Sequence, residues 1–105
     1  MRININSHHI DISDKIKTYI LNKFKKLKKH FNQITLIEIT IISEKNHIKA
    51  EAAVYLSGTD LFADAKKNDI YCAIDDLIGK LDRQIIKHKE KLQGKNHRES
   101  LKKID

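Results

Sequence analysis

The sequence predicts an α+β domain with the element order β-α-β-β-β-α, in which two helices pack on one face of a four-stranded sheet. Apolar and polar residues alternate in four short segments, as in half-buried strands. Two longer segments carry apolar stripes at three- and four-residue spacing, as in amphipathic helices. The chain has 105 residues, a length that suits one domain, and it contains no repeat or Pro-rich linker.

The first strand and the first helix are predicted within residues 2–31. Ile3 and Ile5 alternate with polar neighbours, which indicates a strand. Ser13 is a suitable helix N-cap, and Asp14 places a negative charge in the first helical turn, where it is favourable. The apolar stripe of this helix is made of Ile16, Ile20, Phe24, Leu27 and Phe31.

Three strands joined by short turns are predicted between residues 37 and 65. Residues 43–46 indicate the first turn, and Ser57-Gly58 indicates a second, tighter one. Strands connected this closely form an antiparallel meander. Its inward residues are Ile37, Ile39, Ile41, Ile48, Ala50, Ala52, Val54, Leu61, Ala63 and Ala65.

The second helix is predicted to begin near Asn68 or Asp69, either of which can cap it. Gly79, inside this helix, costs about 1 kcal/mol relative to Ala and has no evident role. Gly94 predicts the helix end, so we expect residues 1–92 to form the domain and residues 93–105 a polar, flexible tail. The apolar stripe is Ile70, Ile74, Leu77, Ile78, Leu81 and Ile85, with Leu92 as an extension.

Positive charge is concentrated in the two predicted helices. The net charge is +7, with 18 Lys and three Arg against 14 acidic residues. Residues 15–30 hold seven Lys and no acid, and residues 80–105 have a net charge of +5, whereas residues 32–65 have a net charge of −3. Because solubility does not require this separation, it predicts a polyanionic partner. The excess of Lys over Arg favours phosphate contacts over the reading of base edges.

Four basic residues form a ridge on the second helix. At about 100° per residue, Lys80, Arg83, Lys87 and Lys91 fall within a sector of roughly 80° beside the apolar stripe. With both helices on one sheet face, this ridge and the lysines of the first helix can merge into one positive strip. The alternative is a solvated helix face with i,i+4 ion pairs, but few acidic residues are placed to pair with the ridge.

No catalytic or metal-binding constellation is found. His8 and His9 lack further ligands nearby, and Asp75 and Asp76 diverge on a helix instead of forming a carboxylate pair. Cys72 is the single cysteine, and we expect it to be buried and inert. The sequence therefore predicts a protein that is not an enzyme and needs no metal or cofactor.

Two aromatic residues, Tyr55 and Phe62, fall on the outer face of the predicted sheet. They can form a small stacking platform for bases, but we expect them to pack at the edge of the core. The chain shows no signal peptide and no apolar run of membrane-spanning length, so we expect a cytoplasmic protein.

Residues 69–89 resemble the signature of a known family. This stretch reads DIYCAIDDLIGKLDRQIIKHK, and the first helix agrees through Ile12-Ser13 and Lys23-Phe24-x-Lys26-Leu27. Over residues 1–92 the chain is similar to the short form of the ribosome hibernation promoting factors, in the family of ribosome-associated translation inhibitors. The matched residues that we interpret as cap and packing are Asp69, Tyr71, Ala73, Ile74 and Asp75.

The resemblance implies a fold similar to double-stranded-RNA-binding domains and a protein that binds rRNA of the small ribosomal subunit. Bound in the decoding channel, such a factor blocks the mRNA and tRNA sites and represses translation in stress or stationary phase, stabilising inactive ribosomes or their dimers. The rRNA-binding residues implied by matching position are Lys23, Lys26, Lys80, Arg83, Lys87, Lys89 and Lys91.

The chain also departs from the family pattern. Lys25, Lys28 and Lys29 exceed it and are candidates for additional rRNA contacts. No counterpart of the long form's dimerisation domain is seen, so we expect a monomer when the protein is free. Whether it promotes or opposes ribosome dimers stays open, because segment 93–105 is intermediate in length between the two short branches.

The alternative function is a basic module that binds another polyanion, namely a structured RNA, an anionic membrane or an acidic protein. Membrane binding would need the apolar stripes to be free, whereas the predicted core needs them buried, so we expect no membrane partner.

Overall fold

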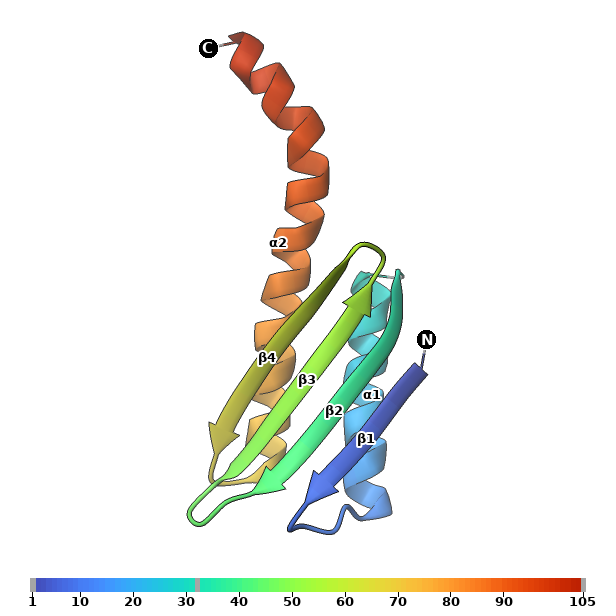
Figure 1. The fold of residues 1–105 in the computed structure, drawn as a ribbon, viewed down its shortest axis with the longest axis vertical. Helices are drawn as coiled ribbons and strands as arrows, with labels where there is room; N and C mark the ends of the chain where they lie inside the picture. The colour runs from blue at the N-terminus through green and yellow to red at the C-terminus, as the bar shows by residue number, and fades with distance from the viewer. Residues whose placement is uncertain (1, 32, 105) are drawn as a thin grey trace.

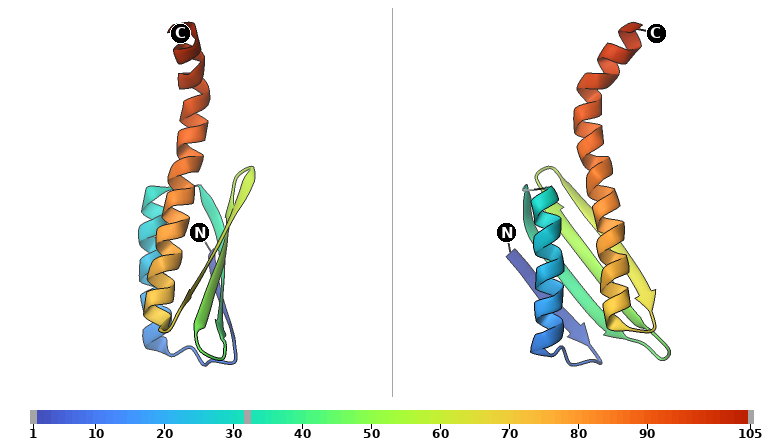
Figure 2. Two further views of the ribbon diagram at one scale, coloured as in Figure 1. Left: turned by 90° about the vertical axis from the view of Figure 1, so that its left-hand side faces the viewer. Right: turned by 180° about the vertical axis from the view of Figure 1, so that it is seen from behind.

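The computed structural model describes the backbone of residues 2–31 and 33–104 and the side chains of residues 2–29, 31 and 33–90. The predicted order β-α-β-β-β-α is confirmed, with one sheet in the strand order β1-β2-β3-β4. Both helices lie on the same face of this sheet (Figures 1 and 2). The elements are β1 (Arg2–His8), α1 (Asp14–His30), β2 (Ile34–Ser43), β3 (Ile48–Leu56), β4 (Thr59–Lys67) and α2 (Ile70–Ile104).

The sheet is parallel at one edge and antiparallel elsewhere. β1 pairs with β2 in parallel, because α1 returns the chain to the end of the sheet at which β1 begins. β2, β3 and β4 form the predicted antiparallel meander. The register aligns Ile5, Ile39, Ala52 and Ala63 in one row across the sheet. Since Ile39, Ala52 and Ala63 are buried, this row faces the helices, and the neighbouring row faces away from them.

Helix α1 begins and packs as predicted. The backbone N–H of Ile16 donates a hydrogen bond of 3.2 Å to the Ser13 hydroxyl, which satisfies one of the donors left free at the helix start. Four of the five predicted stripe residues are buried, namely Ile20, Phe24, Leu27 and Phe31, and Ile16 is partly buried.

Helix α2 begins as predicted but does not end as predicted. The Asp69 carboxylate caps it by accepting a hydrogen bond of 2.7 Å from the backbone N–H of Tyr71. The helix continues through Gly94 to Ile104, so the predicted end at Gly94 is wrong. Gly is tolerated inside a helix at a cost of about 1 kcal/mol, and no Pro follows to stop this one. The side chains from residue 91 onward, and the expected flexibility of residues 93–105, lie outside the described residues.

The core lies between the inner sheet face and the two helical stripes. Small residues on β3 and β4, namely Ala50, Ala52, Ala63 and Ala65, are buried in this core together with Leu77 and Leu81 of α2. No polar or charged residue with a described side chain is buried. No helix among the described residues has the length and apolar character needed to cross a membrane.

Cys72 corrects an expectation from the sequence, because it is exposed rather than buried. The neighbouring Ala73, about 100° further around α2, takes the buried position instead. The negative charge of Asp69 raises the pKa of the Cys72 thiol, and the Sγ atom lies 3.7 Å from the Asp69 Oδ2 atom. A thiol that stays protonated is a poor nucleophile, so the expectation of low reactivity remains.

Phe62 corrects a second expectation. Its residue surface is 57% exposed, so it does not pack at the edge of the core. The strand period of two gives the inward position to Ala63, and Phe62 must point to the opposite face. Tyr55 lies on the same outer face and is partly buried.

We expect opposite effects from replacing two glycines by alanine. Gly58 has a φ of +85° in the β3–β4 turn, so Gly58→Ala should lower the free energy of unfolding by about 1 kcal/mol. Gly79 lies in α2 with open space where the methyl group of an alanine would lie, so Gly79→Ala should raise the free energy of unfolding by about 0.5–1 kcal/mol. Urea denaturation measures the change in the free energy of unfolding for each variant. Changes of the same sign in both variants would contradict the different backbone conformations of Gly58 and Gly79.

Candidate nucleic-acid-binding surface

The basic residues of the two helices lie on two flanks of the helix layer. One flank is the space between α2 and the edge strand β4, and the other is the groove between α1 and α2. Both involve the helix layer, which lies on one face of the sheet (Figure 2). We call them the β4 flank and the interhelical groove.

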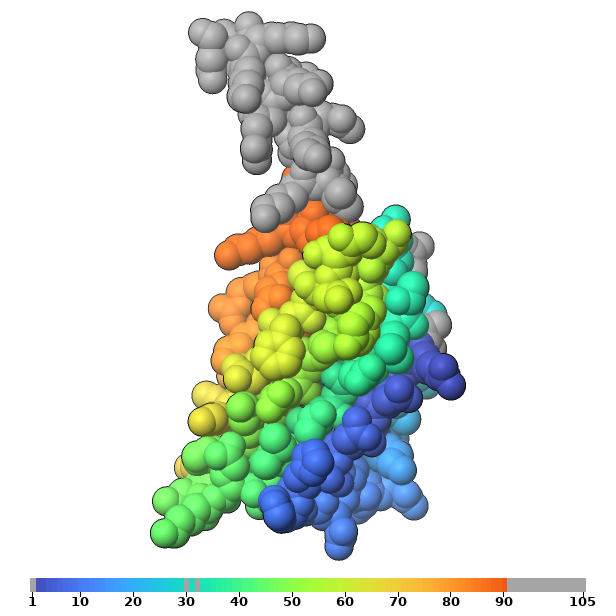
Figure 3. Space-filling view, in the orientation of Figure 1, coloured from blue at the N-terminus to red at the C-terminus, as the bar shows by residue number. Residues whose placement is uncertain are grey.

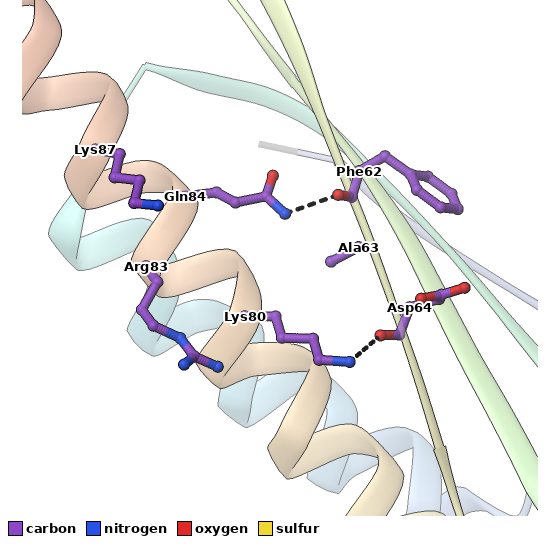
Figure 4. A pocket seen from close by; sticks show the side chains of 7 residues that line it. All are labelled: Phe62, Ala63, Asp64, Lys80, Arg83, Gln84 and Lys87. Carbon is purple, nitrogen blue, oxygen red and sulfur yellow. Dashed lines mark hydrogen bonds between the residues drawn. The ribbon is translucent and has the colours of Figure 1, made fainter.

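The β4 flank contains three of the four residues of the predicted ridge. Lys80, Arg83 and Lys87 project from α2 around a pocket of about 410 Å³ beside Asp64 of β4 (Figure 4). Their spacing along one helix face brings them together as the helical period requires. The side chain of the fourth residue, Lys91, lies outside the described residues.

Two side chains of this flank fasten α2 to the edge of the sheet. Lys80 donates a hydrogen bond of 2.7 Å from Nζ to the Asp64 carbonyl, and Gln84 donates one of 2.8 Å from Nε2 to the Phe62 carbonyl (Figure 4). Lys80 also forms an ion pair of 3.4 Å with Asp76, four residues earlier. Lys80 therefore has a structural role on β4, and the Asp76-x-x-x-Lys80 spacing was the sequence signal for its ion pair.

Arg83 and Lys87 are the more available cations of the β4 flank. Both are exposed, and no ion pair engages either of them among the described residues. Among the described residues, Arg83 donates one hydrogen bond of 3.3 Å, from Nε to the Gly79 carbonyl of its own helix, which leaves its two terminal amino groups without a hydrogen bond there. These two side chains can meet an anion without first breaking a salt bridge.

The interhelical groove combines lysines of α1 with acids of α2. Lys23, Lys26 and Lys29 line it on one side, opposite Asp75 and Asp82. Lys23 Nζ lies 3.4 Å from Asp75 Oδ1, and the same carboxylate oxygen accepts a hydrogen bond of 2.5 Å from the Tyr19 hydroxyl. Lys23 Nζ also lies 5.3 Å from the centre of the Tyr19 ring, so these contacts tie α1 to α2.

The two flanks do not merge into the single positive strip that we expected from the sequence. Asp75, Gly79 and Asp82 line the α2 side of the interhelical groove, between the lysines of α1 and the cations of the β4 flank. The helical angles alone did not show this arrangement, because they leave open which side of α2 faces α1. The lysines of α1 and the cations of the β4 flank are therefore separated by acidic residues on the α1 side of α2.

The remaining predicted residues are more dispersed. Lys89 Nζ lies 6.0 Å from the centre of the Phe31 ring, at the end of α1. Lys25 is exposed and Lys28 is partly exposed, and neither lines the interhelical groove. Among the described residues, no group of three or more His, Cys, Asp or Glu side chains is placed to hold a metal ion.

Fold and surface together define a small basic α+β protein whose helix layer suits the binding of a polyanion. The family described as "Sigma 54 modulation protein / S30EA ribosomal protein" matches residues 3–93, and the chain belongs to this family. The resemblance seen in residues 69–89 is thereby confirmed.

Three comparisons illustrate the relationship. The ribosome hibernation promoting factor of Azotobacter vinelandii is 43% identical over 91 residues, which cover 87% of this chain and 85% of the relative. The factor of the same name from Escherichia coli K12 is 34% identical over 93 residues, covering 89% and 98%. A ribosomal subunit interface protein from Coxiella burnetii has a similar structure, with a TM-score of 0.81, 28% identity and coverage of 85% and 98%. These relatives support a role in ribosome hibernation.

The hydrogen bond between Tyr19 and Asp75 makes a pH-dependent contribution to stability. This bond, helped by partial burial and by the charge of Asp75, raises the pKa of Tyr19 to about 12. A raised pKa means that the folded state holds the proton more tightly, so the stabilisation is complete below the ordinary tyrosine pKa of about 10 and is lost as the pH rises towards 12.

We expect Asp75→Asn to lower the pKa of Tyr19 towards its ordinary value, as measured by tyrosinate absorbance during an alkaline titration. Asp76→Asn is the matched control, because Asp76 pairs with Lys80 and not with Tyr19. A titration that is unchanged by Asp75→Asn would show that the Asp75 carboxylate does not control this proton.

Proposed function

We propose that this protein is a ribosome hibernation factor that binds rRNA of the small ribosomal subunit in the decoding channel, blocks the mRNA and tRNA sites and so represses translation. The observation that carries the proposal is the exposed pair Arg83 and Lys87, which has no ion pair among the described residues, on a chain of this family. Such a factor acts in the cytoplasm, in stress or stationary phase.

The ridge is suited to several phosphates rather than to one. Arg83 and Lys91 are eight residues apart, which is a rise of about 12 Å along the helix axis. A single phosphate cannot span that length, so neighbouring side chains meet successive phosphates of an rRNA strand. Lys ammonium groups bind phosphate as point charges, and Arg83 can form a bidentate contact.

The two separate flanks suggest two rRNA contacts on different segments. Arg83, Lys87 and Lys91 would face one segment at the β4 flank, whereas Lys23, Lys26 and Lys29 would face another across the interhelical groove. The acids between them, Asp75 and Asp82, disfavour a phosphate at the middle of the helix layer. A protein bound in this way fits a channel that has rRNA on two sides, which supports the decoding channel as its location.

The proposed mechanism is steric and needs no chemical step. Occupied mRNA and tRNA sites keep the ribosome idle, and dissociation restores it, so inactive ribosomes or their dimers can be stored. A structured RNA outside the ribosome is the alternative partner and would use the same cations. Competition between that RNA and small subunits for the protein distinguishes the two partners. Membrane binding is disfavoured because the apolar stripe residues Ile20, Leu77 and Leu81 are fully buried.

We expect the double variant Arg83→Glu with Lys87→Glu to bind small subunits much more weakly, and the salt slope of log K to fall by about 2, because two phosphate contacts are lost. Co-sedimentation over a range of salt concentrations measures both. The matched control is Lys45→Glu with Lys66→Glu, which makes the same change in net charge at exposed positions on the sheet side. Equal loss in both variants would show a general charge effect instead of a site.

We also expect binding to exclude decoding ligands. Small subunits first saturated with the protein should fail to form a complex with mRNA and initiator tRNA, as measured by toeprinting. A preformed mRNA–tRNA complex should in turn block binding of the protein. Simultaneous binding of protein, mRNA and tRNA would place the protein elsewhere on the subunit, even if the variants at Arg83 and Lys87 behave as expected.

A further inference from the structure

The outer face of the sheet is a second exposed surface, which the rRNA-binding helix layer leaves unused. Both helices lie behind the sheet, and no described element covers its front (Figures 1 and 2). Figure 3 views the molecule from this side. The strand register places the residues of this face in rows that run from β1 to β4.

An apolar patch occupies the β4 side of this face. Phe62 is 57% exposed, and its ring points away from α2 (Figure 4). Ala53 lies directly across from it on β3, with Tyr55 two residues further along the same strand, and Leu36 lies across from Tyr55 on β2. We call Leu36, Ala53, Tyr55 and Phe62 the outer patch. Phe62 is exposed and the other three residues are partly buried, and an apolar cluster at the surface of a small protein is a candidate interaction site.

Carboxylates surround the outer patch. Asp60 and Asp64 lie two residues before and after Phe62 on β4, and Glu38 lies across from Ala53 on β2. Lys49 forms ion pairs with Asp64, at 3.9 Å, and with Glu51, at 3.4 Å. No ion pair engages Asp60 or Glu38 among the described residues. The patch is thus bordered by negative charge, opposite in sign to the cations of the helix layer.

We propose that the outer patch binds a basic segment of a ribosomal protein, with an apolar side chain against Phe62 and Lys or Arg side chains beside Asp60 and Glu38. The inference rests on the proposed function, because the ribosome is what presents such a segment next to the rRNA on the helix side. RNA is the wrong partner for this face, since its phosphates would meet carboxylates. A segment of opposite charge gains from both the apolar contact and the ion pairs.

A second copy of this chain is also the wrong partner. In a two-fold pairing centred on Phe62, each patch would meet an identical patch. Asp60 and Asp64 flank Phe62 on both sides along β4, so carboxylates would face carboxylates in either relative orientation. Like charges at an interface disfavour that assembly.

Site-specific crosslinking on purified bacterial ribosomes tests the proposal. The full chain carries a benzophenone amino acid in place of Phe62, or in place of Lys87 as the reference for the helix layer. We expect the probe at position 62 to give a protease-sensitive adduct with a ribosomal protein, at a peptide that combines an apolar residue with Lys or Arg. The probe at position 87 should give a ribonuclease-sensitive adduct with rRNA.

The two probes separate the two proposals. If position 87 reaches rRNA while position 62 reaches rRNA, another copy of this chain or nothing, the outer patch is not a protein-binding site and the proposed function stands. If neither position gives an adduct, the chain does not bind the ribosome as proposed, and the inference drawn from the outer patch is overturned with it.

Two substitutions add a quantitative test by co-sedimentation with the same ribosomes. Phe62→Thr, which keeps a residue suited to a strand, should weaken binding about tenfold without changing the salt slope, because no phosphate contact is lost. Asp60→Lys should also weaken binding, whereas an outer face that lies near rRNA would bind more tightly with the added lysine. Asn6→Lys, an exposed change on β1 of the same face, is the control and should have little effect. Tighter binding of Asp60→Lys would overturn the proposal.

Discussion

The burial of two helical stripes against a single face of the sheet is the constraint on which the other features of this protein depend. The inward positions of β3 and β4 are largely alanine, at positions 50, 52, 63 and 65, so the larger side chains of the helices fill the space above them. Because every buried residue with a described side chain is apolar, the charges of this part of the chain must lie on the remaining surfaces. The molecule therefore has a charged helix layer on one side and an uncovered sheet face on the other.

The position of α2 on the sheet determines how its charges are divided. Lys80 and Gln84 bond to carbonyl groups of β4, which would otherwise be open at the edge of the sheet. On the opposite side of α2, Asp75 binds both Tyr19 and Lys23 of α1. The helix is thus held from both sides, and its rotation about its own axis is set. Arg83 and Lys87 face outward at the β4 flank as a consequence, while Asp75 and Asp82 separate them from the lysines of α1.

This division suggests how a chain of modest size can discriminate between partners. The two positive flanks suit phosphates, whereas the carboxylates around Phe62 repel them and attract basic protein. A protein with oppositely charged faces has a preferred orientation in a site built of both RNA and protein. In our proposals the helix layer supplies most of the affinity and the outer patch adds orientation.

The sequence by itself determined the features that depend on neighbouring residues. The alternation of Ile37, Ile39 and Ile41, the cap at Ser13, the start of α2 near Asn68 or Asp69 and the helical stripes as far as Ile85 were predicted correctly, because backbone period and capping act over a few residues. Membership of the family was also visible in residues 69–89. The end of α2 was not predicted correctly, since Gly94 is a weak stop signal without a tertiary contact to support it.

Only the tertiary structure decided which side of each element meets which neighbour. The bond of Lys80 to β4, the position of Asp75 and Asp82 beside α1 and the exposure of Cys72 follow from the placement of α2 against β4 and α1. Helical angles give the order of residues around an axis but not the rotation of that axis against a sheet. That rotation is set by packing between residues far apart in the chain, which no local pattern records.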